Sequence, residues 1–380
     1  MPQVSSEVKR TLSRKKKIIF TAIIAFITFL FCFLLYFGFI YLRSIKFHDK
    51  QVRWIGSSYQ ADKDYGYFPK PNSVAFYLFK TGEKVPVLFD RNGFRVPERR
   101  LRIDRGYKTK ILFLGCSFTH GYGVPAEKTF AHLAAKELNA RELNAGISGG
   151  GFSQMVMRAR KEIPRFKPKY VVAQYSNWLA RRDTRLYKPT DYGKTPTPYF
   201  YESNNKILIH PPAFTTINFD VPIAKYSRKG LLPFTWHVGM PLYLHDDYFV
   251  LVTSLKRLLG ILPKPVQSKE AIVRFAYKEI DRVCRANGAQ MIILKLYSNV
   301  TNKEPDEIEM LGYPVIDTFE PLASRLPART KKAWKKEFRF MRGNPPRLVD
   351  NHPNAKAHRI IAQTIVEGIR AITGRRRTVE

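Results

Sequence analysis

The feature that most constrains this chain is an uncharged apolar stretch near its N-terminus. Residues 18–42 form 25 consecutive positions without Asp, Glu, Lys or Arg, and nearly all are Ile, Phe, Leu, Ala, Tyr or Val. About 20 apolar residues in a helix suffice to cross roughly 30 Å of hydrocarbon. The stretch therefore predicts a transmembrane helix. Residues 1–17 then form a short stub on one side, and the other 338 residues lie on the opposite side.

A cleavable signal peptide is the alternative interpretation of this stretch. The apolar core of such a peptide usually has about 7–15 residues and is followed by small residues, whereas here Arg43-Ser44-Ile45 follows. Six Lys or Arg precede the stretch in residues 9–17, against three in residues 43–50. Because basic flanks stay in the cytoplasm, we expect a single-pass protein of the plasma (inner) membrane. Its N-terminus would be cytoplasmic and its main domain periplasmic or otherwise extracytoplasmic.

The net charge of +34, from 65 basic and 31 acidic residues, predicts an anionic partner. Lipid headgroups or an anionic polymer fit an extracytoplasmic domain. Nucleic acid does not fit, since the chain has neither zinc-finger spacing nor an aromatic RNA-binding signature. The densest basic segment, residues 325–347, has nine Lys or Arg and one acid, Glu337. It is either a solvated helix face and loop or an anion-binding surface beside the active site.

From residue 108 onward, apolar strands alternate with amphipathic helices. Strands are expected at 109–115, 141–145, 169–176, 290–298 and 313–317, and helices at 127–138, 153–163, 268–287 and 354–372. Continuous apolar runs such as 291–294 indicate strands buried on both faces, and hence a doubly wound, mostly parallel α/β sheet.

Other segments surround this domain of residues 108–372. Residues 43–107 are expected to be a juxtamembrane linker and a β-rich lead-in packed on the edge of the domain. Residues 184–265 are rich in Pro, Tyr and Phe and are expected to form an insertion that acts as a cap or substrate wall. Residues 373–380 form a basic tail.

Three polar or glycine positions follow predicted strands directly: Ser117, Gly149 and Asn177. Ligands of doubly wound sheets bind beyond the carboxyl ends of the strands, so we expect these residues to meet at one edge. Each residue taken alone also has a purely structural interpretation: Ser117 as a helix N-cap, Gly149 as an ordinary loop glycine and Asn177 as a turn former. His120, three residues after Ser117, is expected in a surface loop.

Asp350 and His352 lie together just ahead of the last predicted helix. A serine hydroxyl needs a base within about 2.6–3.2 Å to act as a nucleophile. His352 can be that base for Ser117, and Asp350 can fix its tautomer. The Ser117 and Gly149 N–H groups and the Asn177 amide would then stabilise a tetrahedral oxyanion. No cofactor is expected, and no metal, since no Cys, His, Asp and Glu residues have ligand spacing.

These blocks resemble the SGNH (GDSL-like) hydrolase superfamily of acyl-esterases, over about residues 108–372. The segment 115–119 is similar to the family's nucleophile block, with Cys116 in place of aspartate, and 144–149 is similar to its glycine block. The third block keeps only Asn177 of Gly-x-Asn-Asp, and the last has Asp-x-His where many members have Asp-x-x-His. The resemblance implies a flavodoxin-like fold, and Ser117, Asp350 and His352 as catalytic residues.

The sequence thus predicts a membrane-anchored serine hydrolase. Its substrate would be an acyl ester, acetyl or another short chain, on a glycan or cell-envelope molecule, cleaved through an acyl-enzyme. A lipid ester is the nearest rival substrate. An acyltransferase with the same site, and a non-catalytic module that binds an envelope polymer, are the alternatives. The three cysteines imply no disulfide framework, and a single Cys116–Cys284 disulfide is the one pairing that the sequence leaves open.

Overall fold

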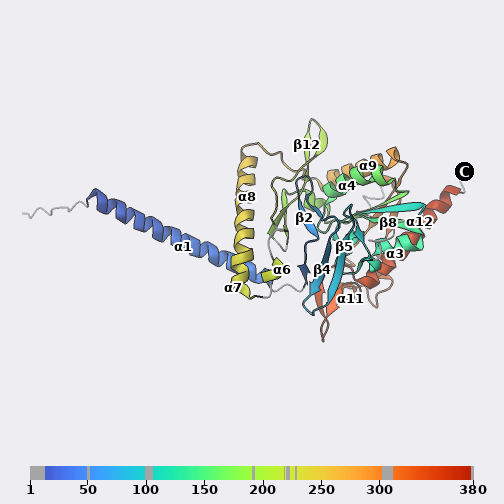
Figure 1. Ribbon diagram of the computed structural model, residues 1–380. Coiled ribbons are helices and arrows are strands. Elements are labelled where there is room, and N and C mark those ends of the chain that lie inside the picture. The colour runs from blue at the N-terminus through green and yellow to red at the C-terminus, as the bar shows by residue number, and fades with distance from the viewer. Residues whose placement is uncertain are drawn as a thin grey trace, which may run out of the picture.

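The protein is built around a nine-stranded sheet. A computed structural model describes residues 13–48, 52–98, 106–190, 193–217, 219, 223–226, 229–301 and 311–377. The strand order of the sheet is β1-β4-β5-β6-β8-β7-β9-β14-β15 (Figure 1). The candidate site residues lie on the loops that leave one edge of this sheet.

Five neighbouring strands of the sheet are parallel. They are β8 (Ala140–Asn144), β7 (Thr109–Leu114), β9 (Tyr170–Tyr175), β14 (Gln290–Lys295) and β15 (Val315–Asp317). This order, 2-1-3-4-5 along the chain, is that of flavodoxin-like sheets. The predicted doubly wound, mostly parallel α/β fold is therefore confirmed. β14 ends at Lys295, earlier than the predicted end at residue 298. The apolar pattern extends further than the strand because Leu296 and Tyr297 are also buried.

The lead-in extends the same sheet in antiparallel fashion. Its strands are β1 (Val52–Ile55), β4 (Val74–Phe79), β5 (Lys84–Phe89) and β6 (Arg95–Val96), and β6 pairs with β8. A further hairpin, β2 (Tyr59–Asp62) and β3 (Gly66–Pro69), stands apart from the sheet. The lead-in thus continues the edge of the sheet and adds a hairpin that reaches the candidate site.

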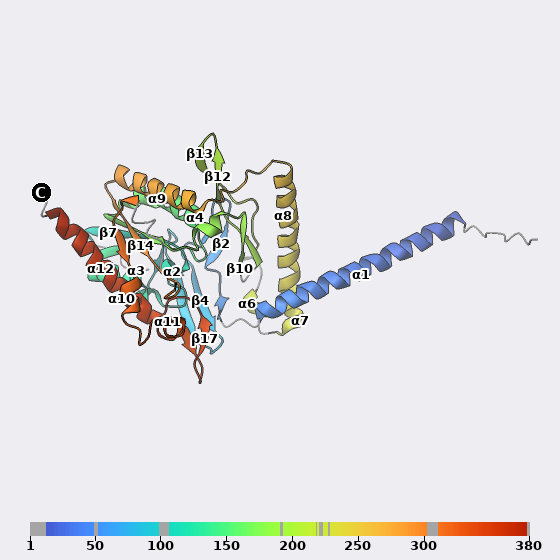
Figure 2. The same ribbon diagram turned by 180° about the vertical axis from the view of Figure 1, so that it is seen from behind.

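Helices cover both faces of the parallel strands. α4 (Phe152–Phe166) packs with α9 (Lys269–Ala286) on one face, and α3 (Phe130–Glu137) packs with α12 (Ala355–Arg377) on the other (Figures 1 and 2). Thr129 and Ser268 cap α3 and α9 by accepting main-chain N–H bonds. The helix predicted at 127–138 begins instead as a 3₁₀ turn, η2 (Ala126–Lys128).

Short elements occupy the edge where the candidate site lies. These are α2 (Ser117–His120), α5 (Ala180–Asp183), α10 (Phe319–Ala323), α11 (Lys331–Phe338) and the hairpin of β16 (Phe340–Arg342) and β17 (Arg347–Asp350). Cys116 and Cys284 are both buried and both free, so they form no disulfide.

The insertion divides into two hairpins and a helical arm. The hairpins are β10 (Tyr187–Thr190) with β11 (Gly193–Pro196), and β12 (Tyr199–Ser203) with β13 (Lys206–His210). The helical arm comprises α6 (Ile223–Tyr226), α7 (Leu231–Phe234), the π-helical turn η3 (Thr235–Gly239) and α8 (Met240–Leu258). α7, η3 and α8 contact the N-terminal helix, so most of the insertion does not form the expected wall over the site.

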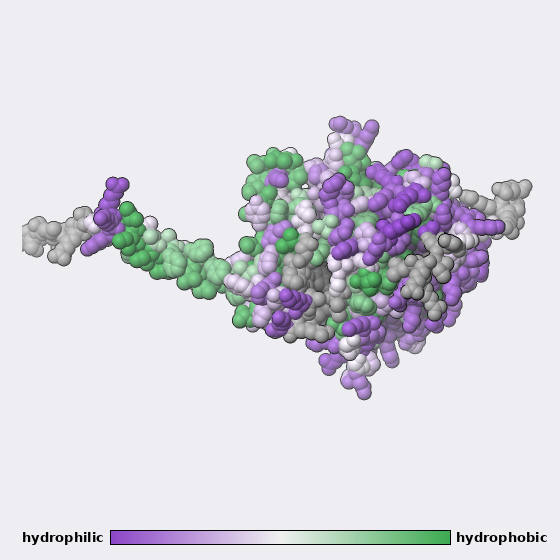
Figure 3. Space-filling view, viewed as in Figure 1, coloured by the Kyte–Doolittle hydropathy of each residue, from purple (hydrophilic) through white to green (hydrophobic). Residues whose placement is uncertain are grey.

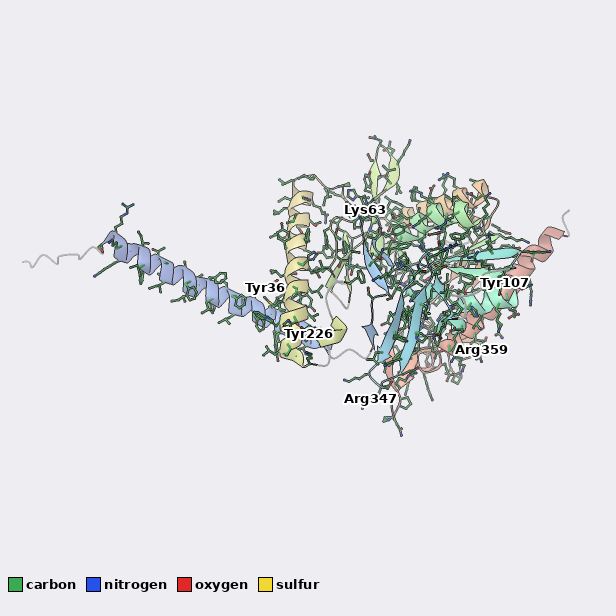
Figure 4. All side chains as sticks on the ribbon, viewed as in Figure 1. Tyr36, Lys63, Tyr107, Tyr226, Arg347 and Arg359 are labelled. Carbon is green, nitrogen blue, oxygen red and sulfur yellow. The ribbon has the colours of Figure 1, made fainter. Side chains whose placement is uncertain are left out.

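The N-terminal helix α1 (Arg14–His48) projects away from the sheet (Figure 1). Its segment Arg14–Ile45 is long and apolar enough to cross a membrane, and side chains from Ile18 to Leu35 are largely exposed. Tyr36 lies where α1 passes α8 (Figure 4). Its hydroxyl donates to Asp247 of α8 at 3.2 Å, and Arg43 forms an ion pair with Asp247 at 2.9 Å. α1 is therefore fixed to the helical arm of the insertion.

Arg95 fastens the lead-in to the loop that follows α2. Its guanidinium is fully buried and donates to the carbonyls of Pro86, His120, Gly121 and Val124. Arg95→Ala would leave these buried acceptors without a donor, so we expect the free energy of unfolding to fall by about 3 kcal/mol. Chemical unfolding of the full chain in detergent measures this, with Arg91→Ala on the neighbouring exposed turn as the control. Equal stability of the two variants would contradict the assignment.

Candidate active site

Ser117 lies where strand β7 ends and the chain turns into α2. Gly115 permits the turn: a Cβ there would lie 2.1 Å from Thr119 Oγ1 and 2.5 Å from Gln174 Oε1. Ser117 is the first residue of α2, so its N–H is one of the groups that have no acceptor within the helix. No main-chain carbonyl among the described residues accepts from the Ser117 N–H, so the turn presents both a hydroxyl and an N–H at the edge of the sheet.

The side chain of Gln174, on the neighbouring strand β9, binds the turn on both sides of Ser117. Its Oε1 accepts from the Cys116 N–H at 3.0 Å and from the Thr119 hydroxyl at 2.7 Å. Its Nε2 donates to the Ser176 hydroxyl at 3.1 Å. Gln174 is completely buried between apolar neighbours. A buried amide with such partners rigidifies the backbone on both sides of Ser117.

His352 links Ser117 to Asp350. The distance from His352 Nε2 to Ser117 Oγ is 2.8 Å, and the distance from Nδ1 to Asp350 Oδ1 is 2.6 Å. The His352 main-chain N–H also donates to Asp350 Oδ1 at 2.7 Å. The Asp-x-His spacing therefore lets the carboxylate reach the ring nitrogen directly, because the loop folds back on itself. Asn354 fixes that loop through the carbonyls of Glu337 and Arg339.

The surroundings of His352 and Asp350 favour a fixed ring and a charged carboxylate. Tyr122 stacks on the imidazole at 4.3 Å between ring centroids, and Phe118 meets it edge-on at 5.6 Å. Burial alone would raise the pKa of Asp350, but His352, with its charge and hydrogen bonds, and Arg339 outweigh burial and hold this pKa below its usual value. Asp350 is thus an acceptor for Nδ1–H over the neutral range.

Gly149 lies at the rim of the same site. Its φ is +77°, and a Cβ would lie 2.9 Å from Lys188 Nζ, so both conformation and space call for glycine. Lys188 of β10 donates to the Gly149 carbonyl and to the Tyr67 hydroxyl, and Tyr67 in turn donates to the Ser148 carbonyl at 2.7 Å. Within the described residues, the Gly149 N–H donates to no main-chain carbonyl. That N–H remains available to an oxyanion.

Asn177 occupies a less definite place. It follows β9 as predicted, but it is exposed, and Trp178 is the residue of this segment that lines the cleft next to His352. Its role as a third oxyanion donor stays a prediction.

A cleft of about 830 Å³ opens beside Phe118 and His352. Its walls come from the β8–α4 loop, α5 and the residues after it, the start of β10, the β14 end and α11. The lining residues are Phe118, Gly149, Trp178, Arg181, Arg182, Arg185, Lys188, Ser298, Asn299, Lys335, Asn351 and His352. Segments far apart in sequence thus enclose a volume large enough for a small organic substrate.

Some residues of the site were missed or misplaced by sequence reasoning. His120 is fully buried and its Nε2 lies 2.8 Å from the Tyr77 hydroxyl, so the expectation of a surface loop was wrong. Gln174 carried a usable signal, because a polar side chain inside an apolar strand is seldom buried without partners. Tyr122 and Lys188 carried none, since each depends on the packing of distant segments.

Asp183 gives the site a pH-dependent support. Its carboxylate accepts from the Phe152 N–H at 2.7 Å and from the Ser153 N–H at 3.0 Å, and so fixes the start of α4 next to Gly149. Burial raises the pKa of Asp183 to about 6, although the hydrogen bonds and Lys188 oppose the rise. A carboxyl whose pKa is higher in the folded protein than in the unfolded chain stabilises the fold less as the pH rises between the two values.

We therefore expect the Asp183 contribution to unfolding free energy to fall by about 2 kcal/mol from pH 4 to pH 6 and to level off only above about pH 7. Stability curves of the full chain and of Asp183→Asn at several pH values measure it, because their difference isolates this group. A difference that is constant across pH 4–7 would contradict the raised pKa.

Comparisons with known proteins add the following. No family model matches the sequence, and no curated protein matches it. Among solved structures, the acetylxylan esterase Axe2 from Geobacillus stearothermophilus is 16% identical, with 70% of this chain and 96% of that chain covered and a TM-score of 0.33. TesA is 12% identical, with 69% of this chain and 98% of that chain covered and a TM-score of 0.35. A putative lipolytic protein of the G-D-S-L family from Desulfitobacterium hafniense is 12% identical, with 69% of this chain and 99% of that chain covered and a TM-score of 0.35.

Proposed function

We propose that this protein is a membrane-anchored serine esterase of the SGNH type. The observation that carries the proposal is the continuous chain of contacts from Ser117 Oγ through His352 to Asp350, at 2.8 and 2.6 Å, beside an open cleft. Each distance is within the reach of proton transfer. A buried turn serine whose hydroxyl meets a carboxylate-bound imidazole has the parts of an activated nucleophile.

The reaction follows from the positions of these groups. Ser117 Oγ attacks the ester carbonyl while its proton passes to His352 Nε2, and Asp350 stabilises the resulting imidazolium. The Ser117 and Gly149 N–H groups, with the Asn177 amide as the third predicted donor, stabilise the oxyanion. His352 then returns the proton to the leaving alkoxide, which leaves Ser117 acylated. Water, activated by the same imidazole, releases the carboxylic acid.

The acyl group is acetyl or another short chain, carried on a glycan or another cell-envelope molecule. Phe118 and Trp178, whose rings are tilted against each other with centroids 5.1 Å apart, offer an apolar wall near the nucleophile. Apart from Gly149, the other lining residues have polar or charged side chains, which suits a hydroxylated carrier more than a long lipid chain. If a sugar hydroxyl replaces water in the second step, the same site acts as an O-acyltransferase.

The location of the domain follows from α1 and its basic flank. The segment 18–42 serves as a single transmembrane anchor in the plasma membrane, with the N-terminus in the cytoplasm and the site on the extracytoplasmic side. The exposed apolar side chains of α1 support this proposal. Protease protection in inside-out and right-side-out vesicles tests the orientation.

The decisive experiment for the activity is active-site labelling. The full chain in detergent is treated with a fluorophosphonate probe, and the adduct is located by mass spectrometry. Label on Ser117 that requires His352 supports the esterase. A folded protein that never labels and turns over no ester would support the non-catalytic module instead. Acyl transfer to an added sugar acceptor, in competition with hydrolysis, would identify a transferase.

A further inference from the structure

We propose that the substrate of this site is anionic: the acyl ester is carried on a saccharide that bears carboxylate or phosphate groups. These groups would bind a cluster of cations on the walls of the cleft, formed by Arg181, Arg182, Arg185 and Lys335. The inference rests on the proposed esterase function and names the class of its substrate.

The charge of the cleft is one-sided. Five of its twelve lining residues are Lys or Arg, and none is Asp or Glu. Arg181 and Arg182 belong to α5, Arg185 lies two residues after its end, and Lys335 comes from α11 on another wall. Cations from different segments thus converge on one hollow next to His352. A concave surface of one sign concentrates ligands of the opposite sign.

The four cations of the cluster are not neutralised by carboxylates among the described residues. In the described part of the chain, Arg181, Arg185 and Lys335 form no ion pair with a carboxylate, although other surface arginines such as Arg274 and Arg329 do. Arg182 donates to the neutral carbonyl of Gly150, which does not neutralise its positive charge. Arg181, Arg185 and Lys335 are exposed. Grouping like charges costs free energy, and an anionic ligand offsets that cost.

The cluster is also at the right place relative to the chemistry. The α5 cations follow Trp178, and Lys188 of the same wall bonds the Gly149 carbonyl beside the oxyanion position. An acyl group at Ser117 therefore leaves its carrier lying along the arginines. Guanidinium groups match carboxylate and phosphate oxygens in bidentate fashion. α11 adds Lys331, Lys332 and Lys336 outside the cleft, so a longer polyanion would find further cations.

Two measurements separate this inference from the esterase proposal. The first is binding of fluorescent oligogalacturonate, of a phosphorylated oligosaccharide and of a neutral xylo-oligosaccharide to the full chain carrying Ser117→Ala. We expect at least about tenfold tighter binding of one or both anionic oligomers, weakened by salt. Arg181→Gln with Arg185→Gln should remove most of that preference, and Arg359→Gln, an exposed arginine on α12, should not (Figure 4).

The second measurement is turnover of acetylated forms of the same oligomers. Preferred hydrolysis of an anionic ester, lost in the double arginine variant, supports both proposals. Equal binding of charged and neutral oligomers would overturn the anionic-substrate inference even if esters are hydrolysed. Selective binding of the anions without any ester turnover or serine labelling would overturn the esterase and leave the binding site standing.

A second, independent observation concerns helix α8. One face of α8 and the turn after it carry exposed apolar side chains at helical spacing: Leu244, Tyr248, Leu251, Leu255, Leu258, Leu259 and Ile261. The opposite face buries Leu242, Asp246 and Thr253 against the protein. Figure 3 shows apolar residues gathered at the end of α8 that lies away from α1. We infer that this face lies on the surface of the lipid bilayer that α1 crosses.

The bilayer is favoured as the occupant because the face continues the surface of α1. Ile40 packs with Leu242 and Tyr243, and Asp247 binds both Tyr36 and Arg43, so the two helices meet where α1 leaves its apolar segment. α8 crosses the direction of α1 instead of running along it (Figure 1). A helix at that level, with its apolar face outward and Lys256 and Arg257 at its flanks, has the pattern of an interfacial helix.

Site-directed fluorescence tests this arrangement. The full chain with Cys32→Ala is labelled with an environment-sensitive dye at Leu255→Cys or, as the control, at Lys256→Cys on the flank of α8. In nanodiscs holding one copy each, we expect a blue-shifted emission and strong quenching by spin-labelled lipids at position 255 only. Equal water exposure at both positions, or shielding at 255 without quenching by lipid, would overturn the inference.

Discussion

Replacing Ser117 by alanine is expected to lower ester turnover by about 10⁴-fold or more, because the attacking oxygen is removed while the cleft remains. Ser117 is only 5% exposed and its hydroxyl meets His352 Nε2 at 2.8 Å, so the substitution removes the oxygen that this imidazole contacts. His352→Ala should cost a similar factor, and the double variant should cost little more than either alone, since the two residues act as a unit.

The measurement is kcat on a chromogenic acetate ester with the full chain in detergent. Ser324→Ala, an exposed serine after α10, is the matched control and should keep the wild-type rate. Near-wild-type turnover in Ser117→Ala would exclude this residue as the nucleophile. Additive losses in the double variant would mean that Ser117 and His352 do not act together.

Replacing Asp350 by asparagine is expected to lower kcat by roughly 10³–10⁴-fold at neutral pH while the protein stays folded. Asp350 Oδ1 accepts from both the main-chain N–H and Nδ1 of His352. An amide can present its NH₂ to Nδ1, which selects the tautomer that protonates Nε2, and such a ring cannot accept the serine proton. Asparagine also removes the negative charge that stabilises the imidazolium.

Activity and stability must both be measured for this variant. Asp64→Asn, an exposed carboxylate in the turn between β2 and β3, is the control. We expect Asp350→Asn to unfold at nearly the wild-type denaturant concentration, so that the loss is one of chemistry. A loss of less than about tenfold would show that His352 needs no carboxylate, which is well outside the range seen for such partners.

The fold itself was accessible from the sequence. In the run 170–175, five of the six residues are apolar or aromatic, and the exception is Gln174. Such runs lack the alternation of a half-exposed strand and indicate strands buried on both faces. Their alternation with amphipathic helices then predicts the parallel sheet, and the carboxyl ends of parallel strands lie at one edge by geometry. The sequence alone therefore places Ser117 and Gly149 at the same edge of the sheet, beyond the carboxyl ends of its strands.

Side-chain geometry and boundaries were harder to predict. The short Asp-x-His spacing left the contact between Asp350 and His352 open, because two residues of loop can point their side chains together or apart. The fold of the loop decides it, through Asn354 and the main-chain N–H of His352. The pairing of the lead-in with the main sheet was likewise hidden, since the sequence indicates short strands and turns there but not that β6 pairs with the distant strand β8.

The sequence by itself determined the α/β sheet, the long apolar helix and the order of the strand-end residues, because these depend on local periodicity and on the geometry of parallel strands. Only the tertiary structure decided that Gln174 braces the serine turn, that Lys188 meets Gly149, and that cations of α5 and α11 share one cleft. Those contacts join segments up to about 150 residues apart, and their partners are chosen by three-dimensional packing, which leaves no periodic trace in the sequence.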